Sequence, residues 1–132
     1  MPITDEDYEA LAAFRRALRE FVAFSEGAAR SAGLTPQQHQ AILAVRGRRG
    51  PMSVGELADE LSIRPHSALE LVGRLAKAEL IERTEAADDH RRIEIRLTPK
   101  ADAALSTLSA AHLAELRRRR ALLRELLDRL GG

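Results

Sequence analysis

The sequence predicts a mainly α-helical fold with a small antiparallel β-hairpin in its second half. Apolar residues recur at helical spacing through most of the chain, and helix-starting residues precede each such stretch. The period becomes alternating only between residues 81 and 97. Because the length of 132 residues suits one compact domain, we expect a single domain over residues 1–132, with long helices at both ends.

The first helix is expected within residues 4–33. Thr4 suits the N-cap, and the acidic residues at 5–7 place negative charge at the positive end of the helix dipole. Gly33 suits the end of the helix. Apolar residues follow alternating spacings of three and four, which is typical of a helix that packs along a partner helix. These residues include Leu11, Phe14, Leu18 and Phe21.

Two further helix starts precede a pair of shorter helices. Thr35 with Gln38, and Ser53 with Glu56, have the spacing of a capping box, in which each side chain binds the other residue's backbone N–H. Each start leads a stretch with apolar residues on one face. We therefore expect short amphipathic helices after residues 35 and 53.

Pro65 starts a fourth helix, since proline is favoured in the first helical turn. Only a short connection separates it from the helix before, which is the helix-turn-helix arrangement. Its apolar and polar residues fall on opposite faces. The face expected to be buried has Ala68, Leu71, Val72 and Leu75, and the exposed face has His66, Glu70, Gly73 and Lys77, with Ser67, Leu69 and Arg74 at its edges.

Residues 81–83 and 93–97 alternate between apolar and polar side chains, as half-buried strands do. The polar residues between them join the two strands as a hairpin. Thr98 and Pro99 then start the last stretch, residues 99–132, which we expect to form C-terminal dimerisation helices. Its apolar residues exceed what one small domain can cover, and they include Leu123, Leu126, Leu127 and Leu130.

Composition excludes several classes of protein. The chain has no cysteine, which rules out disulfides, thiolate catalysis and zinc–thiolate sites. The histidines do not fall at paired metal-ligand spacing, and no Ser-His-Asp arrangement or glycine-rich phosphate loop occurs. We therefore expect no metal, no cofactor and no enzymatic activity. Without a signal-peptide pattern or a membrane-spanning apolar run, a soluble cytoplasmic protein with no membrane partner is expected.

The charge of the chain does not by itself predict a nucleic-acid partner. The formal net charge is +1, and residues 61–100 hold eight bases against seven acids. A polyanionic partner favours a clear basic excess. A prediction of DNA binding therefore depends on the order of the elements and on where particular side chains point.

Several motifs at the joints between the expected elements resemble the multiple antibiotic resistance regulator (MarR) family. They are LTPQQ at 34–38, SVGELA at 53–58, LVGRL at 71–75, LIER at 80–83, and DHR at 89–91 followed by IEIRLTP at 93–99. The resemblance covers nearly the whole chain. It implies a winged helix-turn-helix lobe over residues 34–98, held in a two-fold homodimer by the N-terminal helix (4–33) and the C-terminal helices (99–132).

The resemblance also implies a function. It suggests a sequence-specific transcriptional regulator, by default a repressor, that binds a pseudo-palindromic DNA operator with the fourth helix in a major groove and the wing in a minor groove. Family members often bind small aromatic acids, so the resemblance implies release by a small aromatic or anionic effector. The near-neutral reading segment leaves one alternative open, a winged-helix dimerisation or protein-interaction module that does not read DNA.

The resemblance and the helical phase together single out the site residues. The predicted DNA-binding residues are Ser53, Arg64, His66, Ser67, Leu69, Glu70, Arg74, His90, Arg91 and Arg92, with Asp89 as a support for the wing. The predicted dimer interface consists of Leu11, Phe14, Leu18, Phe21, Leu123, Leu126, Leu127 and Leu130.

Some of these side chains have alternative roles. Glu70 accepts a hydrogen bond from a cytosine amino group, or it pairs with Arg74 at the favourable i, i+4 spacing. Leu69 contacts a thymine methyl group, or it is an ordinary exposed leucine. Glu79 stands where the family commonly ends the reading helix with glycine.

Two polar features of the last helical stretch are also open to interpretation. His112 lies within an apolar stripe, so we expect it in the core or the dimer seam rather than at an effector. The four arginines at 117–120 form a solvated helix turn, or they pair with the acidic start of the first helix across a dimer.

Overall fold

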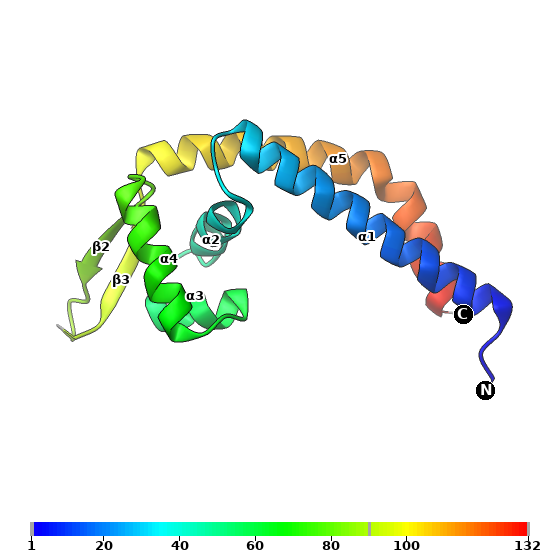
Figure 1. Cartoon of the computed structure of the whole chain (residues 1–132), viewed down its shortest axis with the longest axis horizontal. Helices are drawn as coiled ribbons and strands as arrows, with labels where there is room; N and C mark the ends of the chain where they lie inside the picture. Colours follow the sequence, from blue (N-terminus) through cyan, green and yellow to red (C-terminus); the bar gives the residue numbers. More distant parts are fainter. Residues whose placement is uncertain (1, 90, 132) are drawn as a thin grey trace.

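The computed structural model describes residues 2–89 and 91–131. Two groups of elements are apparent, in which α1 and α5 lie side by side as a long arm and the others form a compact lobe at one end of it (Figure 1). The predicted mainly α-helical fold with a small antiparallel sheet is confirmed. In chain order the elements are α1 (Asp5–Ser31), α2 (Pro36–Gly47), β1 (Met52–Ser53), α3 (Val54–Leu61), α4 (Pro65–Lys77), β2 (Ile81–Glu85), β3 (Ile93–Leu97) and α5 (Pro99–Gly131).

The expected capping boxes start α2 and α3, and Thr4, expected as the N-cap of α1, forms a capping box with Asp7 as well. In α2, the Thr35 hydroxyl accepts a hydrogen bond from the Gln38 backbone N–H at 3.1 Å. The Gln38 side chain in turn accepts from the Thr35 backbone N–H at 3.0 Å. Arg64, at the N-cap of α4, makes no such side-chain bond. That helix depends instead on its first-turn proline and on the burial of its inner face.

The sheet has the strand order β1-β3-β2 and is antiparallel throughout. β2 and β3 form the predicted hairpin, with Ile81 opposite Leu97. β1 was not predicted, because two residues are too few to show a period. It places Met52 opposite Ile95, and both side chains are buried. This short strand therefore fixes the base of the hairpin to the lobe.

The core of the lobe lies between α4 and the elements around it. The apolar residues of α4 pack with Ile42 of α2, Leu57 of α3 and Ile95 of β3. Burial of each large aliphatic side chain stabilises the fold by roughly 1.5–3 kcal/mol. This packing sets which face of α4 points outward. The residues predicted for its inner face, Ala68, Leu71, Val72 and Leu75, are all fully buried.

α5 runs without a break from Pro99 to Gly131, so the expectation of more than one C-terminal helix was wrong. No glycine or proline interrupts residues 100–130, and nothing else in the sequence ends a helix there. α5 runs antiparallel to α1, because Arg119 Nη1 donates to Glu20 Oε2 at 2.8 Å while Arg129 lies 3.9 Å from Glu9. Part of the arginine run thus pairs with α1 of its own chain.

The arm leaves apolar surface uncovered on both of its helices. Leu126 is an exception, since it is 2% exposed and is therefore covered by its own chain. Leu126 and Leu127 point about 100° apart on the helix, so they cannot share one outward face. Leu126 is therefore removed from the predicted dimer interface. Of the other predicted interface residues, Leu11, Leu18, Leu127 and Leu130 are exposed, and Phe14, Phe21 and Leu123 are partly buried.

α1, α2 and α5 meet around two histidines. The ring of buried His39 in α2 lies 4.9 Å from the ring of His112 in α5. His112 Nδ1 donates to the Leu108 carbonyl at 2.6 Å, and its Nε2 lies 2.7 Å from the Ser25 hydroxyl of α1. Both ring nitrogens of His112 thus have partners, as expected of a core histidine. Burial, followed by the nearby His112, holds the pKa of His39 below its usual value.

Candidate nucleic-acid interface

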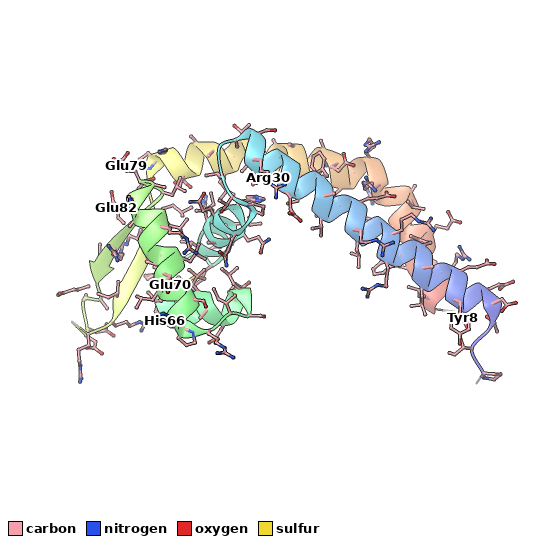
Figure 2. All side chains as sticks on the ribbon, viewed as in Figure 1. Tyr8, Arg30, His66, Glu70, Glu79 and Glu82 are labelled. Carbon is pink, nitrogen blue, oxygen red and sulfur yellow. The ribbon has the colours of Figure 1, made fainter. Side chains whose placement is uncertain are left out.

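The N-terminal half of α4 and the turn of the β2–β3 hairpin lie at the same end of the lobe. Figure 2 shows His66 and Glu70 at this end, with Glu79 and Glu82 at the opposite end, beside the start of α5. The hairpin turn also points away from the arm (Figure 1). The lobe therefore presents a helix and a wing together on a side that the arm leaves free.

The outer face of α4 carries the residues that the helical phase placed there. Leu69 is 55% exposed, which suits either of its two predicted roles. Gly73 is partly buried. The predicted phase is therefore confirmed for this helix, while the contact that Leu69 makes stays a prediction. The exposed residues are His66, Ser67, Leu69, Glu70, Arg74 and Lys77.

Glu70 does not pair with Arg74, which was one of its two predicted roles. Its Oε1 lies 3.0 Å from His66 Nε2, one turn earlier in α4. Helical side chains lean toward the N-terminus, which brings Glu70 toward His66 rather than toward Arg74. Arg74 instead donates from Nη2 to Gln37 Oε1 of α2 at 3.5 Å. His66 and Glu70 therefore form one polar unit in the middle of the exposed face.

In the wing, Asp89 lies against Arg91. Asp89 Oδ1 accepts from the Arg91 backbone N–H at 3.0 Å and lies 3.6 Å from Arg91 Nε. The Arg91 side chain is 94% exposed, so its guanidinium remains free to meet an anion. This arrangement is what the predicted supporting role of Asp89 requires. His90, a predicted DNA-binding residue, lies outside the described residues.

Arg92 points back into the lobe, although it was predicted to contact DNA. Its Nη2 donates to Glu56 Oε1 of α3 at 3.0 Å. The same carboxylate pairs with Arg48, which follows α2. Hydrogen bonds from Ser53, the backbone N–H first, and then the charge of Arg48 hold the pKa of Glu56 below its usual value. Glu56 is therefore ionised at neutral pH, and Arg92 is already engaged.

Two other residues predicted to contact DNA are Ser53 and Arg64, and only the first has a side chain that already makes a local hydrogen bond. Ser53 is partly buried, and its hydroxyl caps α3 by accepting from the Glu56 backbone N–H at 3.1 Å. Arg64 is exposed at the start of α4, where its side chain makes no capping bond. Ser53 thus already has a local role, whereas Arg64 is free to reach toward a phosphate.

Sequence reasoning missed the residues that hold the site together. Arg48 lies in no motif, Gln37 was visible only as part of the motif at 34–38, and Glu56 only as part of the motif at 53–58 and of a capping box. The partners of Glu56 lie 8 and 36 residues away in the chain. No periodicity connects positions so far apart. Within the described part of the chain, no group of three or more His, Asp or Glu side chains is placed to hold a metal ion.

Comparison with known proteins finds similarity to one family. A family model described as the MarR family matches residues 32–92, from the end of α1 to the wing. The curated relative HTH-type transcriptional repressor MdtR of Bacillus subtilis is 30% identical over 86 residues, which are 65% of this chain and 55% of that relative. AbsC of Streptomyces coelicolor, a MarR family transcriptional regulator of known structure, superposes with a TM-score of 0.77 at 20% identity, over 97% of this chain and 89% of its own. Residues 32–92 of the chain thus match the MarR family, and the whole chain has the fold of that family.

The MarR family fold extends over the arm as well as the lobe. A mutant of MepR from Staphylococcus aureus, solved bound to an oligodeoxyribonucleotide, superposes with a TM-score of 0.72 over 98% of this chain and 99% of its own. At 19% identity this likeness shows the fold alone. The chain spans only about half the length of the curated relative, MdtR. Among the helices described, none combines the length and the apolar character that crossing a membrane requires.

Proposed function

We propose that this chain is a sequence-specific DNA-binding regulator of transcription of the MarR family. The observation that carries the proposal is that the outer face of α4 and the wing lie at one end of the lobe, on a side that the arm leaves free. A helix enters the major groove of a duplex, and a wing reaches the adjacent groove. The MepR relative bound to an oligodeoxyribonucleotide supports the proposal. An enzymatic activity is not expected, and the cytoplasmic localisation stays a prediction.

We propose that the chain acts as a homodimer through the arm. α5 has an open groove of about 450 Å³, which Leu113, Leu116, Leu123 and Leu127 line together with arginines. Leu11 and Leu18 of α1 are exposed as well. Uncovered leucines on two long helices favour an interface with a second copy. A two-fold dimer presents two reading helices, so its operator is expected to be pseudo-palindromic.

Repression and effector release are further proposals. MdtR is named as a repressor, and occupation of a promoter blocks transcription, which together support repression here. A small aromatic or anionic effector is proposed from the family alone. Its identity is left open, because no described feature selects one chemical class.

Selection of bound duplexes from a random pool tests the proposed function directly. We expect enrichment of a pseudo-palindrome with half-sites about one helical turn apart. If about six phosphates are neutralised, fluorescence anisotropy should give a slope of log K against log salt near −5. The near-neutral segment 61–100, with eight bases and seven acids, favours one rival, a protein-interaction module. Absence of an enriched motif together with a flat salt response would support that rival.

A further inference from the structure

The carboxylate of Glu56 joins three parts of the lobe. Its Oε1 accepts from the Ser53 backbone N–H and from Arg92 Nη2, both at 3.0 Å. Its Oε2 pairs with Arg48 Nη2. Glu56 lies in the first turn of α3, Arg48 directly follows α2, and Arg92 directly precedes β3. Only the bond from Ser53 belongs to the capping box, so the two arginine contacts serve another purpose.

Arg92 is the residue through which the wing is held. Its carbonyl accepts from the Ala86 backbone N–H at 2.9 Å, and its own N–H donates to the Asp89 carbonyl at 3.1 Å. These bonds close the turn of the hairpin. The side chain of Arg92 leaves the turn and reaches α3. A contact on this side chain therefore restrains the turn that carries Arg91.

Arg48 braces the same carboxylate from the other side. Its Nε donates to the Pro51 carbonyl at 3.1 Å, so Arg48 also holds the chain that leads into β1. The Glu56 side chain is 28% exposed, less than either arginine. Charge-assisted hydrogen bonds at a partly buried carboxylate are stronger than ion pairs in open solvent.

We propose that Glu56 is a positioning residue for DNA binding, which holds the wing against α3 through Arg92 so that Arg91 and the outer face of α4 meet the duplex together. Arg92 is then a structural link and not a phosphate contact. The inference rests on the proposed DNA-binding function.

The sign of the effect separates this role from a simple charge effect. Glu56 is an anion on a lobe that approaches phosphates, so its loss by charge alone would strengthen DNA binding. Loss of a positioning contact would weaken binding instead. The two outcomes have opposite directions.

The decisive variant is Glu56→Gln, because glutamine keeps an oxygen for the capping box with Ser53 but removes the negative charge that strengthens the contacts to Arg48 and Arg92. The matched control is Glu60→Gln, since Glu60 lies on the same helix, is exposed and makes no side-chain hydrogen bond or ion pair with any residue the structure describes. We expect Glu56→Gln to bind the selected operator on the order of tenfold more weakly than wild type. Glu60→Gln should bind as tightly as wild type or slightly more tightly.

Hydrogen exchange gives a readout that does not depend on DNA. In free Glu56→Gln, the amides of Ala86 and Arg92 should exchange faster than in wild type, while amides in α1 and α5 keep their protection. In a further variant, Arg92→Gln, the addition of Glu56→Gln should not weaken operator binding any further, because the two residues act on the wing through one contact.

Equal or tighter operator binding by Glu56→Gln overturns the proposal, and so does unchanged exchange at Ala86 and Arg92. An equal loss of binding in Glu60→Gln also overturns it. A wild-type chain that binds no duplex is a different outcome, because it contradicts the proposed function itself. Far-ultraviolet circular dichroism of each variant shows whether the helices are retained.

Discussion

Glu70 lies in the middle of the exposed face of α4, where its carboxylate contacts His66 rather than Arg74. If it accepts from a cytosine amino group in the complex, Glu70→Ala should relax the preference at one base pair of each half-site by about 1–3 kcal/mol. Affinity for unrelated DNA should rise slightly, because a negative charge leaves a surface that approaches phosphates. Motif selection with wild type and Glu70→Ala measures both effects.

The contact with His66 supplies the control for that experiment. If Glu70 only holds His66, then His66→Ala should change the selected motif in the same way as Glu70→Ala. Identical motifs for wild type and Glu70→Ala would remove Glu70 from the base-reading residues.

His39 makes stability depend on pH, because its pKa is lowered in the folded chain, first by burial and then by His112. The unfolded chain therefore binds more protons just below the ordinary value of 6.5. The His39 contribution to stability is complete above that value and is lost as the pH falls below it. Urea unfolding should accordingly have a lower midpoint at about pH 5.5 than at about pH 7.5, and His39→Gln should reduce the difference.

Carboxylates with lowered pKa values, such as Glu56, stay ionised between about pH 5.5 and about pH 7.5. They therefore do not contribute to the change in stability over this interval. His66→Gln serves as the control, because His66 is an exposed histidine on α4. An equal pH dependence in wild type and His39→Gln would show that the buried histidine does not carry the effect.

At the scale of the element, the end of α4 shows how a helix stops without glycine. The Leu80 N–H donates to the Leu75 carbonyl at 2.9 Å and the Glu79 N–H to the Ala76 carbonyl at 3.0 Å, which is a Schellman motif. This motif needs a left-handed residue, and Glu79 has φ 61°. A side chain in that region costs roughly 1–2 kcal/mol. α1 ends in the same motif with Gly33 at φ 81°.

The comparison of these two helix ends gives a paired prediction. Glu79→Gly should raise the free energy of unfolding by about 0.5–1 kcal/mol, because glycine adopts a left-handed conformation without strain. Gly33→Ala should lower it by about 1 kcal/mol or more. Urea denaturation at one fixed protein concentration measures both. A destabilised Glu79→Gly variant would contradict the account of the cap.

At the scale of the whole molecule, substitutions of two neighbouring leucines on α5 should distinguish an effect on folding from an effect on dimerisation. Leu126 is covered by its own chain, whereas Leu127 is 56% exposed and lines the open groove. Leu127→Asp should weaken the proposed dimer and make the thermal midpoint depend more steeply on protein concentration. Leu126→Asp should lower the free energy of unfolding by about 3 kcal/mol or more at any concentration, because it buries a charge.

Light scattering coupled to size exclusion measures the molar mass, and thermal scans at several concentrations measure the midpoint. A wild-type chain that is a stable monomer at micromolar concentration would contradict the homodimer. Similar behaviour of the two variants would show that Leu127 also belongs to the subunit core.

The sequence alone determined the features that depend on near neighbours. Capping boxes span three residues, and the inner face of α4 follows the helical period, so both could be predicted and both were found. The hairpin followed from its alternating pattern. The outer face of α4 followed for the same reason, and with it most of the residues proposed to meet DNA.

The tertiary structure alone decided which of several local options each side chain takes. Arg74 could have paired with Glu70 one turn before it, but the fold placed Arg74 against Gln37 of α2, 37 residues away in the chain. The phase of α5 against α1 turned Leu126 inward, and the fold brought Arg92 to Glu56, 36 residues away in the chain. Such contacts depend on distances between elements, which local spacing does not encode.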